Sequence, residues 1–358
     1  MSQGPRDEVR AVRATPQVAV VAGEGKRQRA GGRGSDEGAG PAMPAEARGQ
    51  RSIRQREQRL AFALIAPGVV IVLALVVLPV LWNVALSFRE LRLIELRDFS
   101  PLTLDLSTEN YDEVLGDDDF VELLRTTLVY AVAGTAASVL LGLWAAVVVQ
   151  KAFPGRFVVR GLILFPYVVP VVAAALLWRT MLNPQIGILS SWIQSLFATG
   201  NVDFLTNRSF DLELFGVQFG LPAAFAMIIL FEGWRSFPFA FLFILARLQA
   251  LPAELYEAAE VDGASALQSF RNITLPQLRG VIAVVVLLRF IWTFNTFDEI
   301  YLLTGGAGGT QVVSVQIYEY LFGRSDIGAA SALSIVLALV LVVLLGLYFR
   351  FVPTEETG

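Results

Sequence analysis

Six long apolar runs constrain the fold of this sequence more than any other feature. A helix needs about 20 residues to cross about 30 Å of hydrocarbon. Six stretches meet that requirement: 61–82, 126–150, 161–182, 220–246, 280–303 and 327–349. Because 55% of the residues are hydrophobic and only 17% are charged, the chain lies outside the range of soluble domains. We therefore predict an all-α integral membrane protein with six transmembrane helices.

The regions flanking these runs predict a disordered tail and an orientation. Residues 1–58 are rich in Gly, Ala, Pro and Arg and poor in aromatic residues, which favours a disordered cytoplasmic tail before a transmembrane domain at 59–353. Basic residues precede the first run, fill the second connection and frame the fourth, so these segments belong on the cytoplasmic side. They are Arg51, Arg54, Arg56, Arg59, Lys151, Arg156, Arg160, Arg247, Arg271 and Arg279. Six spans then place both termini in the cytoplasm of a cell-membrane protein.

The residue types that are missing exclude several classes of chemistry. The chain has no Cys and no His, which removes disulfides, thiolate catalysis, Cys or His metal sites and histidine acid–base catalysis. We expect no catalytic residue, no metal and no nucleic-acid partner, since the net charge is only −4 and the basic residues do not cluster. An ATP-binding P-loop is also missing, because Gly25-Lys26 lacks the other residues of that motif.

Two charged residues interrupt the fourth apolar run near its middle. Glu232 and Arg235 lie where each charge costs about 2.5 to 3.5 kcal/mol on insertion scales, so they should face protein or water. Their spacing of three allows them to pair on one helix face. Two interpretations remain open, a compensating pair or the lining of a transport path, and Trp234 lies between them on another face.

The fifth apolar run carries a polar and aromatic stripe. In a continuous helix its members fall within an arc of about 120°: Arg289, Trp292, Asn295, Thr296 and Glu299. Asp298 lies at the edge of this stripe. An indole can cover the C–H face of a sugar while polar groups bind its hydroxyls. Hydrogen bonding between helices explains the stripe equally well.

A charged island separates the fourth and fifth runs. Pro252, Glu254 and Glu257 favour a helix start, Gly263 predicts a break, and Pro276 is expected to close the segment before the next span. We predict a short cytoplasmic helix at about 252–270. Its acidic residues disfavour an anionic lipid surface, which leaves docking on a soluble partner or a plain connecting helix.

This island resembles the signature of the binding-protein-dependent ABC importer permeases. The matching positions are Glu257, Ala258, Ala259, Asp262, Gly263, Ala264, Ile273, Leu275 and Pro276. Stretches 165–183, 246–259 and 290–309 are similar to the carbohydrate branch of that family and to its maltose-type first permease subunit. One departure is Ala307, because the family usually has Gly-Gly-Pro where this chain reads Gly305, Gly306 and Ala307.

The resemblance implies the type I ABC importer permease fold and a set of partners. These are a second homologous permease, two cytoplasmic ATPase subunits that carry ATP and Mg, an extracytoplasmic solute-binding protein, a sugar substrate and membrane lipid. No cofactor is then expected on this chain. The island becomes the coupling helix, in which Glu257, Ala258, Ala259, Asp262, Gly263 and Ala264 contact the ATPase.

Three alternatives to a sugar importer subunit differ in what they require of the sequence. A permease for another solute, such as an amino acid, would fit the same coupling signature. An ion-driven secondary transporter would be expected to show internal repeats or broken ion-coordinating helices, and has no use for a docking helix. An intramembrane enzyme needs a nucleophile and base or a metal cluster, for which the chain offers neither His, Cys nor a G-x-S-x-G run.

Overall fold

The structure is a computed structural model that describes residues 60–97, 106–151, 153–197, 203–206, 210–214, 217–221 and 223–351. The predicted disordered tail at 1–58 lies outside the described residues. The chain divides into two units, Met1–Pro67 and Gly68–Gly358. The packing contacts described below lie within the second unit.

The helices agree with the predicted all-α membrane fold. Five are long and apolar enough to span a membrane, and a bent pair of helices brings the number to six if the pair is counted as one span. The five are Leu60–Ser87, Phe120–Val149 (α4), Ala223–Gln249 (α8), Ala266–Phe294 and Ile327–Phe351 (α14). Within the first of them lie a π-helical turn, η1 (Leu73–Val77), and α2 (Leu78–Ser87).

The third span is bent rather than continuous. We predicted one helix over 161–182, but α5 (Arg156–Val168) and α6 (Val171–Met181) meet at an angle of 94°. Val169 between them is extended, with ψ of 133°, because the ring of Pro170 disfavours the helical conformation in the residue before it. The prediction of an unbroken helix was therefore wrong at this proline.

The fifth span starts earlier than predicted. A continuous helix runs from Ala266 through α10 (Ala266–Ser269), η3 (Phe270–Thr274) and α11 (Leu275–Phe294). Pro276 does not close the preceding segment, because the π-helical turn η3 lies where the proline ring would otherwise meet the carbonyl four residues earlier.

The fifth span also ends earlier than predicted, at Phe294 instead of residue 303. Asn295 Nδ2 donates to the carbonyl of Ile291 at 2.8 Å, and the Thr296 hydroxyl donates to the carbonyl of Trp292 at 3.1 Å. Side chains that bond backbone groups in this way compete with the helical ladder. The chain then turns and forms a separate short helix, α12 (Asp298–Leu303).

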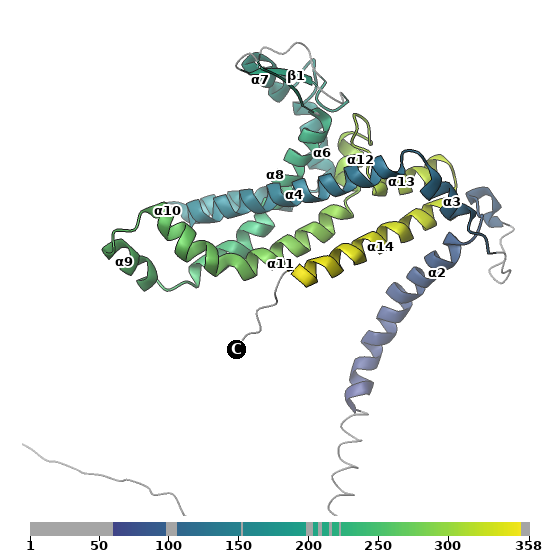
Figure 1. Cartoon of the computed structure of the whole chain (residues 1–358), viewed down its shortest axis with the longest axis horizontal. Coiled ribbons are helices and arrows are strands. Elements are labelled where there is room, and N and C mark those ends of the chain that lie inside the picture. The colour runs from purple at the N-terminus through teal and green to yellow at the C-terminus, as the bar shows by residue number, and fades with distance from the viewer. Residues whose placement is uncertain are drawn as a thin grey trace, which may run out of the picture. The chain divides into compact units, whose positions relative to one another are not determined.

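The helices pack through small side chains. Figure 1 shows α4 running beside α8, and these two helices carry many of the buried residues of the second unit. A Cβ atom on Gly142 of α4 would lie 2.6 Å from Ala240 Cβ and 2.8 Å from Phe241 N of α8. The two backbones can approach this closely only because Gly142 has no side chain. Next to them, α11 packs on α4, and α14 packs on α2 and on α3 (Glu109–Gly116).

The remaining elements are short and connect the spans. They are η2 (Leu93–Arg97), α7 (Ile188–Phe197), the strands β1 (Phe210–Leu214) and β2 (Val217–Leu221), α9 (Glu254–Val261), α13 (Val313–Tyr318) and η4 (Glu319–Gly323). The strands form an antiparallel hairpin in which Phe210 lies opposite Leu221. This hairpin was not predicted, and it leaves the fold almost entirely helical.

Candidate functional site

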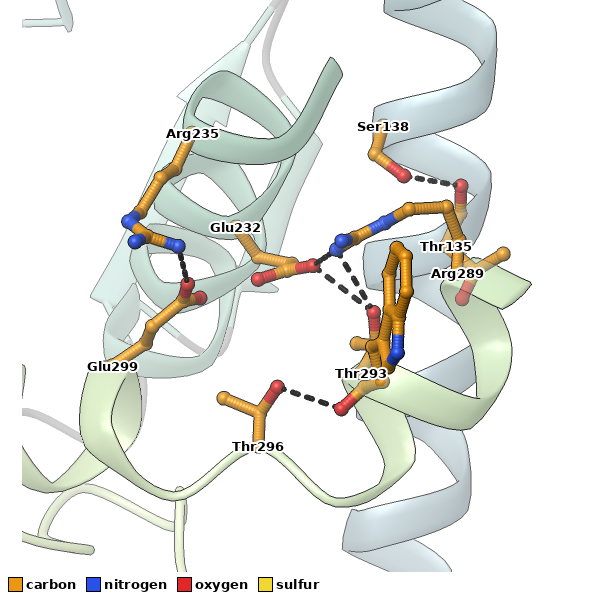
Figure 2. A network of polar contacts seen from close by, with 9 residues as sticks. Thr135, Ser138, Glu232, Arg235, Arg289, Thr293, Thr296 and Glu299 are labelled. Carbon is orange, nitrogen blue, oxygen red and sulfur yellow. Dashed lines mark hydrogen bonds and ion pairs between the residues drawn. The ribbon is translucent and has the colours of Figure 1, made fainter. Parts of the chain in front are cut away.

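Four charged side chains meet where α8, α11 and α12 come together. Glu232 forms an ion pair with Arg289 of α11, and Arg235 Nη1 lies 2.9 Å from Glu299 Oε1 of α12. Figure 2 shows the two pairs next to each other. Glu232 and Arg235 are therefore not paired with each other, and of the two interpretations left open, a compensating pair along one helix face is wrong. Each finds its partner on another element, which ties α8 to both sides of the break after Phe294.

A hydroxyl and a glycine complete the inner ion pair. The Thr293 hydroxyl donates to Glu232 Oε1 at 3.0 Å and accepts from Arg289 Nη2 at 3.2 Å. A Cβ atom on Gly134 of α4 would lie 2.9 Å from Glu232 Cγ and 3.0 Å from Thr293 Cγ2. The missing side chain at Gly134 thus leaves room for this ion pair between three helices.

A cavity of about 410 Å³ borders the four charges. Its lining is polar and aromatic: Tyr167, Glu232, Arg235, Ser236, Arg289, Trp292, Thr296 and Glu299. The indole of Trp292 is 45% exposed, packs edge-on against Phe239 at 4.9 Å, and lies beside the Arg289 guanidinium at 5.8 Å. An aromatic plane, hydroxyls and charged groups therefore face one open cavity, a combination that suits a ligand with hydroxyl groups on an apolar ring.

The structure brings most of the predicted path residues to this cavity, and leaves three outside its lining. Trp234 packs on Trp178 and Phe231, with ring centroids 5.6 and 6.0 Å away. Asn295 is exposed and bonds its own helix, and Asp298 is exposed in the first turn of α12.

The stripe expected on one helical face does not exist as such. The helix ends at Phe294, so Thr296 and Glu299 reach the cavity because the chain turns, not because of helical periodicity. Two lining residues were missed, Tyr167 and Ser236. Ser236 follows Glu232 by one helical turn, which was a usable signal, whereas Tyr167 enters the lining from α5, next to the bend.

Several buried polar atoms of this cluster have no hydrogen-bond partner among the described residues. They are Glu299 Oε2, Arg235 Nε, Arg289 Nε and the hydroxyls of Tyr130 and Thr135. Buried polar atoms are rarely left unpaired. The cluster therefore has unused donors and an unused acceptor in addition to its two ion pairs.

A second candidate site is the loop between α8 and α11. No residue of α9 is buried, and Glu257 and Ala258 are exposed, whereas Ala259 and Ala264 are half-buried. Gly263 breaks the segment with φ of +76°, a conformation that favours glycine. Ser265 and Gln268 then form a capping box that starts the long helix of the fifth span.

The helix expected at about 252–270 is two helices. The first is α9 (Glu254–Val261), which ends before Asp262 and Gly263, and residues from Ala266 onward belong to the continuous helix that ends at Phe294. One contact connects the two, since the Tyr256 hydroxyl lies 3.0 Å from the Thr274 hydroxyl. The exposed α9 is thus bonded to the base of the span that carries Arg289.

Comparison with known proteins identifies relatives along most of the chain. The trehalose/maltose transport system permease protein MalF of Thermococcus litoralis is 34% identical over 287 residues, which are 79% of this chain and 90% of the relative. The inner membrane ABC transporter permease protein YcjO of Escherichia coli is 34% identical over 78% of this chain and 90% of its own length. The trehalose transport system permease protein SugA of Mycobacterium tuberculosis is 31% identical, with coverage of 79% and 85%.

Solved structures have the same fold. A bacterial ABC transporter involved in the import of the acidic polysaccharide alginate aligns with a TM-score of 0.65 at 21% identity, over 86% of this chain and all of that chain. The alginate transporter in complex with its alginate pentasaccharide-bound periplasmic protein aligns with a TM-score of 0.64 at 22% identity, over 82% and 94%. Residues 138–355 match the family model for the inner membrane component of binding-protein-dependent transport systems. This chain belongs to that family, and it is a multi-pass membrane permease.

Proposed function

We propose that this chain is one of the two permease subunits of an ATP-driven sugar importer, forming half of its translocation path. Its relatives include permeases named for trehalose and maltose transport. This supports a sugar over an amino acid, and a subunit of an ABC importer over an ion-driven transporter that works alone.

One structural observation carries the coupling part of the proposal. The exposed α9 is bonded through Tyr256 to a single helix that continues from Ala266 to Phe294 and holds Arg289 near its far end. At 1.5 Å per residue, the distance along this helix from Thr274, which Tyr256 contacts, to Arg289 is about 22 Å. A partner that moves α9 would therefore move one side of the buried charge cluster.

The partners follow from the same scheme. Two cytoplasmic ATPase subunits bind ATP and Mg and dock on the loop that includes Glu257, Ala258, Ala259, Asp262, Gly263 and Ala264. A second homologous permease completes the path, and a solute-binding protein delivers the sugar from outside. The chain itself hydrolyses no ATP and binds no cofactor. The basic residues beside the first, second and fourth connections support cytoplasmic termini.

The sugar path in this subunit is the cavity beside the charge cluster. Trp292 offers a flat apolar surface, and the Thr296, Ser236 and Tyr167 side chains offer hydroxyls within the same lining. The charged pairs hold the wall in place. Hydrogen bonds of the Asn295 and Thr296 side chains to their own helix favour a turn at this point, which is what shapes the wall.

Co-purification of the chain from its native membrane tests the assembly. We expect an ATPase subunit and a second permease to elute with it, and ATP-dependent sugar uptake in proteoliposomes when a solute-binding protein is added. A lone chain that transports solute down an ion gradient would refute the proposal.

Uptake of trehalose and of maltose by variants of the assembled transporter tests the path. Removing the Trp292 indole should lower uptake by about tenfold, because one good contact between the ring and a sugar changes affinity by about that factor. Trp144→Ala is the matched control, because Trp144 of α4 is 67% exposed and lies outside the cavity lining. Unchanged uptake by Trp292→Ala would show that the polar groups only hold helices together.

A further inference from the structure

The short helix α7 (Ile188–Phe197) presents an apolar face that nothing in the described chain covers. Its inner face packs on the protein, where Leu189 and Ile193 contact a core formed by Leu182, Phe204, Leu205, Ala223 and Met227. The opposite face is strongly exposed: Ile188 64%, Trp192 68% and Leu196 76%, with Ile186 just before the helix at 76%. Residues 188, 192 and 196 follow one another at intervals of four, which aligns them along the helix.

The hydroxyl groups on this face have hydrogen-bond partners within the helix and do not need water. The Ser191 hydroxyl donates to the carbonyl of Ile188 at 2.8 Å, and the Ser195 hydroxyl donates to that of Trp192 at 2.9 Å. Just before the helix, Asn183 Oδ1 accepts from the backbone N–H groups of Gln185 and Ile186. Hydroxyls that are satisfied within their own helix can enter an apolar medium at little cost.

Charge is missing from this part of the sequence. Between Arg179 and Asp203 the chain has no Asp, Glu, Lys or Arg. A surface that docks reversibly on a soluble protein is usually bordered by charges, which guide association and keep the free surface soluble. A helix of this composition has no such border over 23 residues.

The position of α7 along the spans places it at the membrane boundary. It packs against Ala223 and Met227, which belong to the first two turns of α8, and against Leu182, which directly follows α6. Both α6 and α8 belong to candidate spans. The helix therefore lies at the level where a span ends, which is also where Trp side chains are enriched in membrane proteins.

We propose that the exposed face of α7 lies in the lipid interface of the bilayer, with Ile188, Trp192 and Leu196 immersed among the upper acyl chains. This surface anchors the connection between the third and fourth spans to lipid. The proposal is independent of the transported solute, because it depends only on the exposed apolar face, the internally bonded hydroxyls and the absence of charge.

The native chain has no cysteine, so single-cysteine variants can be labelled cleanly. Leu196→Cys and Ile188→Cys report on the exposed face of α7, and Asp118→Cys is the control, since Asp118 is exposed in the acidic connection just before α4, outside the candidate spans. Each full-length variant, purified with the subunits that accompany it, is labelled with an NBD fluorophore. It is placed in phosphatidylcholine nanodiscs, either plain or brominated near the glycerol end of the acyl chains, and iodide is the aqueous quencher.

The two quenchers distinguish lipid, water and protein around the label. We expect the labels at 188 and 196 to lose most of their emission in brominated lipid and little with iodide, and the label at 118 to show the reverse. Strong quenching by iodide alone at 188 and 196 would mean that the face is in water. Protection from both quenchers would mean that a protein subunit covers it, and either outcome overturns the proposal. Two labelled positions guard against one variant that fails to fold.

Discussion

Two islands of charge stand out in this apolar chain: the buried cluster of Glu232, Arg235, Arg289 and Glu299, and the exposed helix α9. The charged side chains of the two islands differ in burial and in ion pairing. Glu232 is 1% exposed and ion-paired to Arg289, and Glu299 is 6% exposed and paired to Arg235. In α9 no residue is buried, and none of its acidic side chains forms an ion pair with a described residue.

The difference separates two uses of charge in a membrane protein. A charge buried between helices has to be compensated within the chain, since removing one partner of such a pair is strongly destabilising. Charges that remain exposed and unpaired at the end of a span contribute little to folding. They are available to another protein, so variants in the two islands should fail in different ways.

The largest expected effect is the loss of one carboxylate from the buried island. Glu232→Gln leaves the Arg289 guanidinium buried beside a neutral group, and we expect a loss of about 3 to 5 kcal/mol in unfolding free energy. The midpoint of SDS-induced unfolding in mixed micelles measures it. Glu260→Gln in α9 is the matched control, expected to change stability by less than about 0.5 kcal/mol. Equal losses for the two variants would remove the distinction between the islands.

A smaller loss is expected when the space for the buried pair is filled. In Gly134→Ala the new methyl group would lie 2.9 Å from Glu232 Cγ and 3.0 Å from Thr293 Cγ2. Overpacking of this kind destabilises by about 1 to 3 kcal/mol, measured by the same unfolding assay. The control is Gly280→Ala in α11, which meets no atom within 4 Å and should be neutral or slightly stabilising. A stable Gly134→Ala variant would show that the helices can separate around the pair.

The outer pair can be measured by a double-mutant cycle. Arg235→Met and Glu299→Gln remove the two ends of a contact of 2.9 Å that joins α8 to α12. We expect a coupling free energy of about 1 to 2 kcal/mol, because the side chain of Arg235 is partly exposed and the contact is screened more than the inner pair. Additive losses would mean that the pair does not hold α12 in place.

The smallest effect on stability is expected in the exposed island. Gly263→Ala meets no neighbouring atom, but it places a side chain on a residue with φ of +76°. We expect a loss of about 1 kcal/mol from this conformation, together with weaker retention of the ATPase during purification. A variant that keeps both full stability and full ATPase retention would argue against a role for the turn.

The approximate positions of the spans and the presence of charged residues in them could be predicted from the sequence, but the pairing of these charges could not. Apolar length alone located the long helices approximately, because spanning a bilayer demands about 20 apolar residues. Arg235 lies within pairing distance of Glu232 in sequence, whereas its actual partner is Glu299, 64 residues away, and only tertiary packing brings the two together. The breaks at Pro170 and Asn295 were also missed. Proline was a visible signal at the first, while the second depends on side-chain bonds to backbone carbonyls within an otherwise apolar run.

One paired measurement shows whether buried charges maintain the fold while exposed charges bind a partner. Glu257→Lys and Glu232→Gln are purified in parallel from the native membrane, and both the ATPase retained per permease and the unfolding midpoint are measured. We predict that Glu257→Lys loses the ATPase with an unchanged midpoint, whereas the midpoint falls sharply in Glu232→Gln. If Glu257→Lys keeps its ATPase, or loses stability as Glu232→Gln does, the buried and the exposed charges do not have these separate roles.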